Sequence, residues 1–156
     1  MIHSIMIKGT KLIRKSGEGI IFNERNEPIF EIHPSKKYTI DIFTNEDALF
    51  AKCTAVSKSK LSSISGKGAY VFSSNMNEEI IRIHYSGFSG LQRTMEYQNN
   101  VYPFSRLKRK FIFADTEIKL KHQWNGTLHA SIKSNKYFNQ LVCIASYVWY
   151  RNDMQH

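Results

Sequence analysis

The chain has 156 residues, of which 42% are hydrophobic, which is enough for one domain with a buried core and excludes a disordered chain. Lys and Arg number 22 against 13 Asp and Glu, giving a formal net charge of +9. Such a charge favours anionic partners such as nucleic acid, acidic lipid headgroups or acidic proteins, although it can also serve solubility alone. No apolar stretch reaches the roughly 20 residues that a membrane-spanning helix needs.

The amino-terminal sequence and the cysteines bear on the compartment. Residues 1–8 contain no basic leader followed by a sustained apolar segment, so we expect no signal peptide. Cys53 and Cys143 lie far apart in the sequence, each between apolar residues, which is typical of buried free thiols. A single disulfide between them is the alternative. We therefore expect a cytoplasmic protein, either free or peripheral at the inner face of a membrane.

Most of the chain has the pattern of short strands joined by polar turns. Apolar residues alternate with polar ones over short runs, and clusters of Asn, Asp, Ser and Gly separate these runs. The expected strands are 19–22 with 28–32, 38–42 with 49–55, 69–72 with 79–85, a short strand at 93–97, and 111–113 with 118–120, followed by 128–132 after the Asn125–Gly126 turn. This pattern predicts about ten to twelve strands.

A single helix is expected at the end of the chain, at about 136–151. Ser134 and Asn135 are suitable capping residues, and apolar residues then recur at helical spacing. Residues 141–150 carry no charge, and both faces of the expected helix are apolar. A helix that is apolar all round must be buried, so we expect a curved sheet to enclose it. The fold class is therefore mainly β: one domain, 1–156, forming an antiparallel barrel around a hydrophobic C-terminal helix.

The order of these elements resembles the tubby C-terminal-like superfamily, which includes tubby proteins, LURP-one-related proteins and phospholipid scramblases. The segments that carry the resemblance are Ile20–Ile32, Tyr38–Ile42, Ala48–Lys52 and Tyr137–Val148. The resemblance implies a closed barrel of about twelve strands around a very hydrophobic helix, and a role in binding phospholipid headgroups. The chain is short for this fold, so one strand is expected to be missing. No Lys or Arg aligns with the basic pair that binds phosphoinositides in tubby domains.

The densest positive charge lies in residues 106–110. If a strand begins there, its alternate residues point to one face, and the lysines that follow the turn at Asp115 repeat the pattern. Paired strands would then present a group of like charges, which repel one another unless an anion lies between them. The sequence predicts an anion-binding site formed by Arg106, Lys108, Lys110, Lys119 and Lys121. The alternative is a solvated outer face.

Two other basic segments are weaker candidates. Residues 57–68 are rich in Ser and Gly and predict a loop or a blunted sheet edge, with a secondary anion contact at Lys58, Lys60 and Lys67. Near the amino terminus, apolar residues separate four cations, Lys8, Lys11, Arg14 and Lys15. That pattern is typical either of an amphipathic membrane-surface segment or of a first strand with a polar outer face.

The sequence offers little for catalysis or for metal binding. The six histidines are not paired at helical spacing, and His122 and His129 flank one turn as the nearest approach to a pair. A metal site normally needs three or four ligands, so no metal and no cofactor is expected. There is no Gly-x-Ser-x-Gly motif, and apolar surroundings lower thiol reactivity. We therefore expect no enzymatic activity.

The leading functional hypothesis is a non-enzymatic module that binds anionic ligands, foremost phospholipid headgroups at the cytoplasmic face of a membrane. A nucleic-acid-binding barrel is the first alternative, because aromatic residues such as Tyr102 and Phe104 precede the basic run and could stack on bases. A protein-interaction or structural module, in which the charge serves only solubility, is the second.

Overall fold

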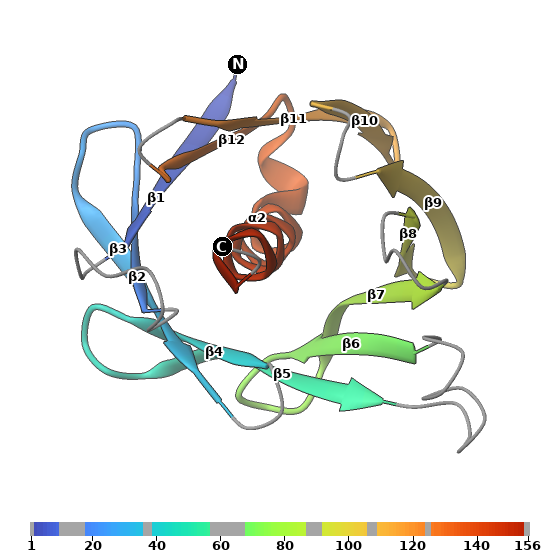
Figure 1. Ribbon diagram of the computed structural model, residues 1–156, viewed down its shortest axis with the longest axis horizontal. Coiled ribbons are helices and arrows are strands. Elements are labelled where there is room, and N and C mark those ends of the chain that lie inside the picture. Colours follow the sequence, from blue (N-terminus) through green and yellow to red (C-terminus); the bar gives the residue numbers. More distant parts are fainter. Residues whose placement is uncertain are drawn as a thin grey trace.

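The computed structural model describes residues 2–9, 18–35, 39–56, 68–86, 92–105, 109–123 and 126–154. Twelve antiparallel strands form one sheet that curls into a nearly closed barrel, and helix α2 lies at its centre (Figure 1). This arrangement confirms the predicted fold class. The expectation of a missing strand is wrong, because all twelve strands are present and several of them are only four to six residues long.

The elements follow one another in chain order around the barrel and end with the helix. They are β1 (His3–Gly9), β2 (Gly19–Phe22), β3 (Pro28–Pro34), β4 (Ile40–Thr44), β5 (Leu49–Val56), β6 (Gly68–Ser73), β7 (Glu79–Ser86), β8 (Gln92–Tyr97), β9 (Asn100–Ser105), β10 (Lys110–Phe113), β11 (Thr116–His122), β12 (Leu128–Ile132), η2 (Asn135–Tyr137) and α2 (Phe138–Met154). The sequence predicted ten of these strands: it left β1 as one of two alternatives for the amino-terminal segment, and it missed β9, whose Pro103 lowers the strand signal. Proline is tolerated at a sheet edge, which is where β9 lies.

The barrel has one seam, between β9 and β10, which are the two ends of the hydrogen-bonded strand order. Elsewhere each strand pairs with its sequence neighbours, and β1 closes the circle by pairing with β12. Aromatic rings span the seam: Tyr102 of β9 lies 5.2 Å from Phe113 of β10, between ring centroids, and Tyr137 packs edge-on against Phe113 at 5.4 Å. Side-chain packing therefore closes the barrel where backbone pairing stops.

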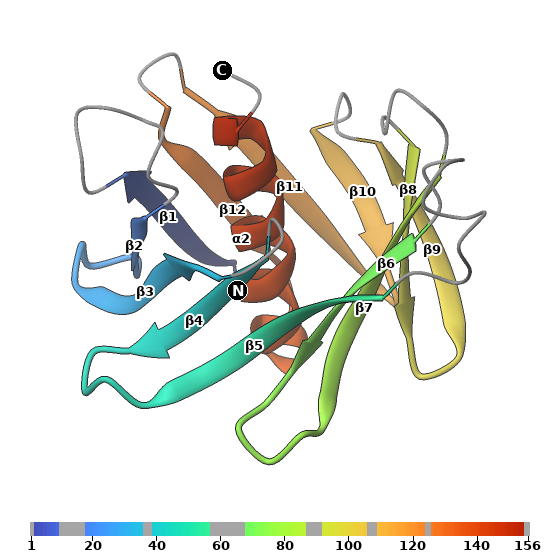
Figure 2. The same ribbon diagram turned by 60° about the horizontal axis from the view of Figure 1, so that its bottom comes forward.

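The meander topology sorts the connections to two ends of the barrel (Figure 2). We call one the turn end, where β2–β3, β4–β5, β6–β7, β8–β9 and β10–β11 are joined by tight turns and where β12 leads into the helix. We call the other the loop end, where β1–β2, β3–β4, β5–β6, β7–β8, β9–β10 and β11–β12 are joined. Helix α2 begins at the turn end and finishes at the loop end, where the Trp149 Nε1 atom donates to the Gly126 carbonyl at 3.3 Å.

Four five-residue turns share one construction. In each, the fourth residue has a positive φ, which Asn, Asp and Gly tolerate best: Asn26, Asp47, Asn77 and Gly126. The amide of that residue donates to the carbonyl of the first residue of the turn, as in Asn26 to Asn23 at 3.1 Å. Asn, Asp and Gly at these positions therefore allow tight reversals between strands.

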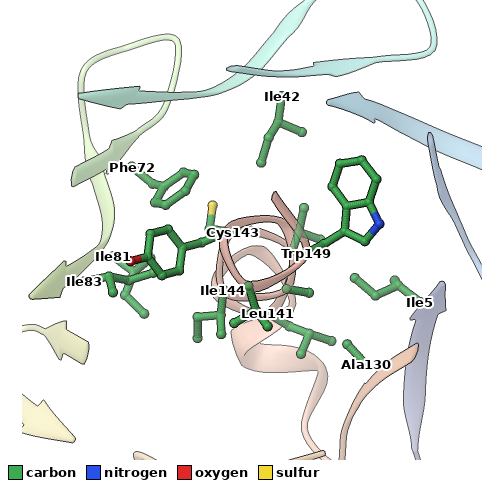
Figure 3. Close-up of a cluster of buried hydrophobic side chains, with 14 of the residues drawn as sticks. Ile5, Ile42, Phe72, Ile81, Ile83, Ala130, Leu141, Cys143, Ile144 and Trp149 are labelled. Carbon is green, nitrogen blue, oxygen red and sulfur yellow. The ribbon is translucent and has the colours of Figure 1, made fainter. Parts of the chain in front are cut away.

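Alternation along the strands places one set of side chains inside the barrel, where they meet the helix (Figure 3). Every residue of α2 from Leu141 to Tyr150 is buried. Polar side chains in and next to this stretch have partners: Ser146 Oγ donates to the Val142 carbonyl at 2.7 Å, and Gln140 Nε2 donates to the Ile80 carbonyl at 3.3 Å. Ser134 caps the start of this segment by accepting from the Lys136 amide, as the sequence predicted.

Within the described part of the chain, no helix combines the length and the apolar character needed to cross a bilayer.

The contact between Gly19 and Trp149 gives a test of this packing. A Cβ at Gly19 would lie 2.7 Å from the Trp149 Cη2 atom, so Gly19→Ala forces the indole out of place. Overpacking of this kind typically costs about 1–3 kcal/mol of unfolding free energy, measurable by urea denaturation. In a Trp149→Phe background, which removes the clashing ring, the same substitution should cost clearly less. An equal cost in both backgrounds would contradict the contact.

Candidate anion-binding site

Three of the five predicted site residues are described, and they lie on the outer face of β10 and β11. We call Lys110, Lys119 and Lys121 the basic strip. Alternation produces it, because Phe111, Ile118 and Leu120 on the same strands point inward and are buried. All three lysines are exposed. Lys110 is the direct cross-strand partner of Lys119, and Lys121 follows two residues later on the face that the sequence predicted these lysines to share.

The basic strip is only partly neutralised. The Lys119 Nζ atom lies 3.8 Å from the Glu117 Oε1 atom, which makes a weak and half-exposed ion pair. Lys110 and Lys121 make no ion pair with the residues that the structure describes. Like charges that face each other across two strands are destabilising, so an anion bound between Lys110 and Lys119 would relieve a real repulsion.

Two basic side chains of β7 on the outer face of the barrel have close acidic partners. Arg82 of β7 lies 2.8 Å from Glu79, and the His84 ring lies 3.1 Å from the Glu96 carboxylate on the neighbouring strand β8. The basic strip differs from β7 because its three lysines have a single, weak acidic partner among the described residues, Glu117. It is also bordered by His129, the cross-strand partner of Lys121, and by Ile112, which is 58% exposed.

The remaining predicted cations fall outside the described residues. These are Arg106 and Lys108 of the main site, Lys58, Lys60 and Lys67 of the secondary site, and Lys11, Arg14 and Lys15 near the amino terminus. Of the amino-terminal group, Lys8 is described. It is an exposed residue of strand β1, with its Nζ atom 5.5 Å from the centroid of the Phe22 ring. The structure therefore confirms that Lys8 belongs to a first strand with a polar outer face, and not to an amphipathic membrane-surface segment.

A second group of cations lies inside the barrel at the loop end, and sequence reasoning missed it. The Arg93 side chain is buried, and its Nε atom donates to the Tyr147 hydroxyl at 2.9 Å. Its guanidinium lies about equally far from two rings, 5.9 Å from Tyr85 and 6.0 Å from Tyr147. One helical turn later, the Arg151 guanidinium lies 5.7 Å from the Tyr70 ring. The signal that could have found Arg93 is its position two residues before the inward-facing Met95.

The three tyrosines of this interior group contact one another. The Tyr70 ring lies 5.2 Å from both the Tyr85 and the Tyr147 rings. Burial raises the pKa of the Tyr70 hydroxyl to about 12, although the nearby Arg151 opposes this shift. Gly68 makes the packing possible, since a Cβ there would lie 2.5 Å from the Tyr85 hydroxyl oxygen. The group ties the carboxyl-terminal part of α2 to strands β6, β7 and β8.

The geometry does not assemble a metal site or a reactive thiol among the described residues. No three His, Cys, Asp or Glu side chains come together there. His122 and His129, which flank the turn between β11 and β12, are not cross-strand partners: His129 pairs with Lys121, and His122 pairs with Leu128. Burial raises the pKa of the Cys53 thiol to about 12 and that of the Cys143 thiol well above its usual range.

The buried thiols predict slow alkylation. At pH 8 a thiol with a pKa of about 12 is almost wholly protonated, and burial also blocks access, so iodoacetamide should modify neither Cys53 nor Cys143 in the folded protein. Both should react when the chain is unfolded in urea. Mass spectrometry follows the reaction, with the exposed variant Gln123→Cys as the positive control. Alkylation of the native chain as fast as that control would contradict the buried positions.

The hydrogen bond between Arg93 and Tyr147 predicts a stability effect. Tyr147→Phe removes the acceptor of a buried charged donor, so the unfolding free energy should fall by about 1–3 kcal/mol in urea denaturation. Tyr102→Phe is the control, because the Tyr102 hydroxyl makes no hydrogen bond within the described residues and its ring contact with Phe113 is kept. Equal effects of the two substitutions would mean that this hydrogen bond contributes nothing.

Comparison of the chain with protein-family models, with curated proteins and with solved structures finds no significant match.

Proposed function

We propose that the protein is a non-enzymatic module that binds anionic phospholipid headgroups on a membrane surface through the basic strip. The observation that carries the proposal is the pairing of Lys110 with Lys119 across β10 and β11, with Lys121 beside them on the same exposed face. Ammonium groups at the ends of flexible side chains can each meet a phosphate oxygen without a preformed pocket.

The charge balance and the neighbouring surface support the same proposal. Each Lys or Arg close to an anionic membrane contributes about 1 kcal/mol, so a few of them give reversible docking rather than permanent attachment. The exposed Ile112 lies beside the strip, and an apolar side chain next to cations is typical of surfaces that dock on lipid. The predicted resemblance to the tubby C-terminal-like superfamily, with its lipid role, points in the same direction.

Neutralising two lysines of the strip should weaken docking selectively. Lys110→Gln with Lys121→Gln removes about 2 kcal/mol of attraction, which corresponds to about 30-fold weaker binding to anionic vesicles. Cosedimentation with phosphatidylserine-containing and neutral vesicles at about 0.1 M salt measures the effect. The matched control is Arg25→Gln with Lys133→Gln, which removes two exposed cations at the turn end.

The control and a competitor separate the alternatives. The proposal expects the control pair to bind almost as tightly as the unmodified chain, and neutral vesicles to bind weakly. Equal losses for both pairs would mean that net charge alone drives binding, and no loss for the strip pair would exclude the strip. Displacement from vesicles by single-stranded or duplex nucleic acid, with a steep dependence on salt, would favour a nucleic-acid partner instead.

A further inference from the structure

The two ends of the barrel carry opposite charge. At the turn end, the turns that join successive strands hold six exposed acidic residues: Glu24, Glu27, Glu46, Asp47, Glu78 and Asp115. The exposed cations described at that end are Arg25, Lys133 and Lys136. The short turns therefore form an end with a net negative charge, even though the chain as a whole is strongly basic.

The loop end has the opposite balance. Its described cations are Lys8 at the end of β1, Arg109 and Lys110 at the start of β10, Lys121 at the end of β11, and Arg151 in the last turns of α2. Within the described ranges, the acidic residues close to this end are Glu18, Asp41 and Asp153, the last of these in the final turn of α2, and Asp41 is the cross-strand partner of Lys52. Five cations thus lie near the open end of the barrel into which the helix leads.

The amino-acid sequence adds to this imbalance. Segments 10–17, 36–38, 57–67 and 106–108 each connect two strands whose described ends lie at the loop end. Their sequences contain no Asp or Glu and hold ten cations, Lys11, Arg14, Lys15, Lys36, Lys37, Lys58, Lys60, Lys67, Arg106 and Lys108. By sequence, therefore, the segments that connect these strand ends are basic, whereas the described turns at the turn end are acidic.

We infer that the protein docks end-on, with the loop end against an anionic bilayer and the turn end directed away from it. This inference rests on the proposed function and adds an orientation to it. Attraction to a charged surface decays within a Debye length, about 8 Å at physiological salt, so only cations near the contacting end contribute fully. End-on docking brings the loop-end cations within that distance while it holds the acidic turns far from the lipid.

The alternative orientation is side-on, with the outer wall of β10 and β11 flat against the bilayer. That orientation also uses the basic strip, and it would bury the exposed Ile112. However, it brings Asp115 and Glu117, at the turn-end side of the same two strands, to the anionic surface. Their repulsion offsets part of the attraction of the lysines, so the end-on orientation is electrostatically better.

Site-specific labelling distinguishes the two orientations. Single cysteines are introduced at three exposed positions, Gln123→Cys at the loop end, Ile112→Cys on the outer wall and Met76→Cys at the tip of the β6–β7 turn. The native thiols are buried, so a thiol-reactive fluorophore labels only the introduced residue. Each labelled chain is then bound to phosphatidylserine and phosphatidylcholine vesicles that contain a lipid with a nitroxide on its headgroup, which quenches fluorophores at the surface.

Cosedimentation of each labelled chain is measured first, and quenching is compared only for bound protein. End-on docking predicts strong quenching at position 123, weaker quenching at 112 and almost none at 76. Quenching at 112 that exceeds that at 123, or strong quenching at 76, would overturn the end-on orientation while leaving lipid binding intact. Failure of all three chains, and of the unmodified protein, to sediment with the vesicles would overturn the proposed function and this inference together.

Discussion

The burial of helix α2 inside the sheet is the constraint on which the rest of the structure depends. A barrel of eight strands can fill its interior with its own side chains, but a barrel of twelve encloses more space than strand residues fill. The helix, in turn, has no polar face from Leu141 to Tyr150 and could not lie against water. Each element therefore supplies what the other lacks, and close approaches such as Gly19 to Trp149 follow from filling this space tightly.

Enclosing the helix also determines where polar groups can lie inside the barrel. Gln140 and Trp149 direct their donors to backbone carbonyls of the wall, which satisfies groups that would otherwise be costly to bury. At the loop end, Arg93 and Arg151 are held among Tyr70, Tyr85 and Tyr147, whose ring faces interact favourably with cations. These contacts join the end of the helix to one side of the barrel, as the aromatic contacts of Phe113 join β9 to β10 across the seam.

The charged side chains are distributed unevenly over the outer surface, and composition alone does not show this distribution. Arg82 and His84 of β7 have glutamate partners, whereas Lys110 and Lys121 on β10 and β11 do not have them among the described residues. Along the barrel axis, the acidic turns lie at one end and the described exposed cations Lys8, Arg109, Lys110 and Lys121 lie near the other, because a meander sends alternate connections to alternate ends. The charge of the chain is therefore distributed asymmetrically along the barrel axis. Such an asymmetry is the property that orients a protein at a charged surface.

Several features were determined by the sequence alone. Period-two alternation, turn residues and one uncharged apolar segment predicted the barrel, the hairpins and the enclosed helix, because these signals depend on local geometry. Alternation also predicted that Lys110 and Lys119 share a face, although not that they are direct partners, because register depends on the whole sheet. Only the tertiary structure determined the number of strands, the edge position of β9, the interior position of Arg93 and the opposite charge of the two ends. Each of these depends on which distant segments become neighbours when the sheet closes around the helix, and no local pattern in the chain records that.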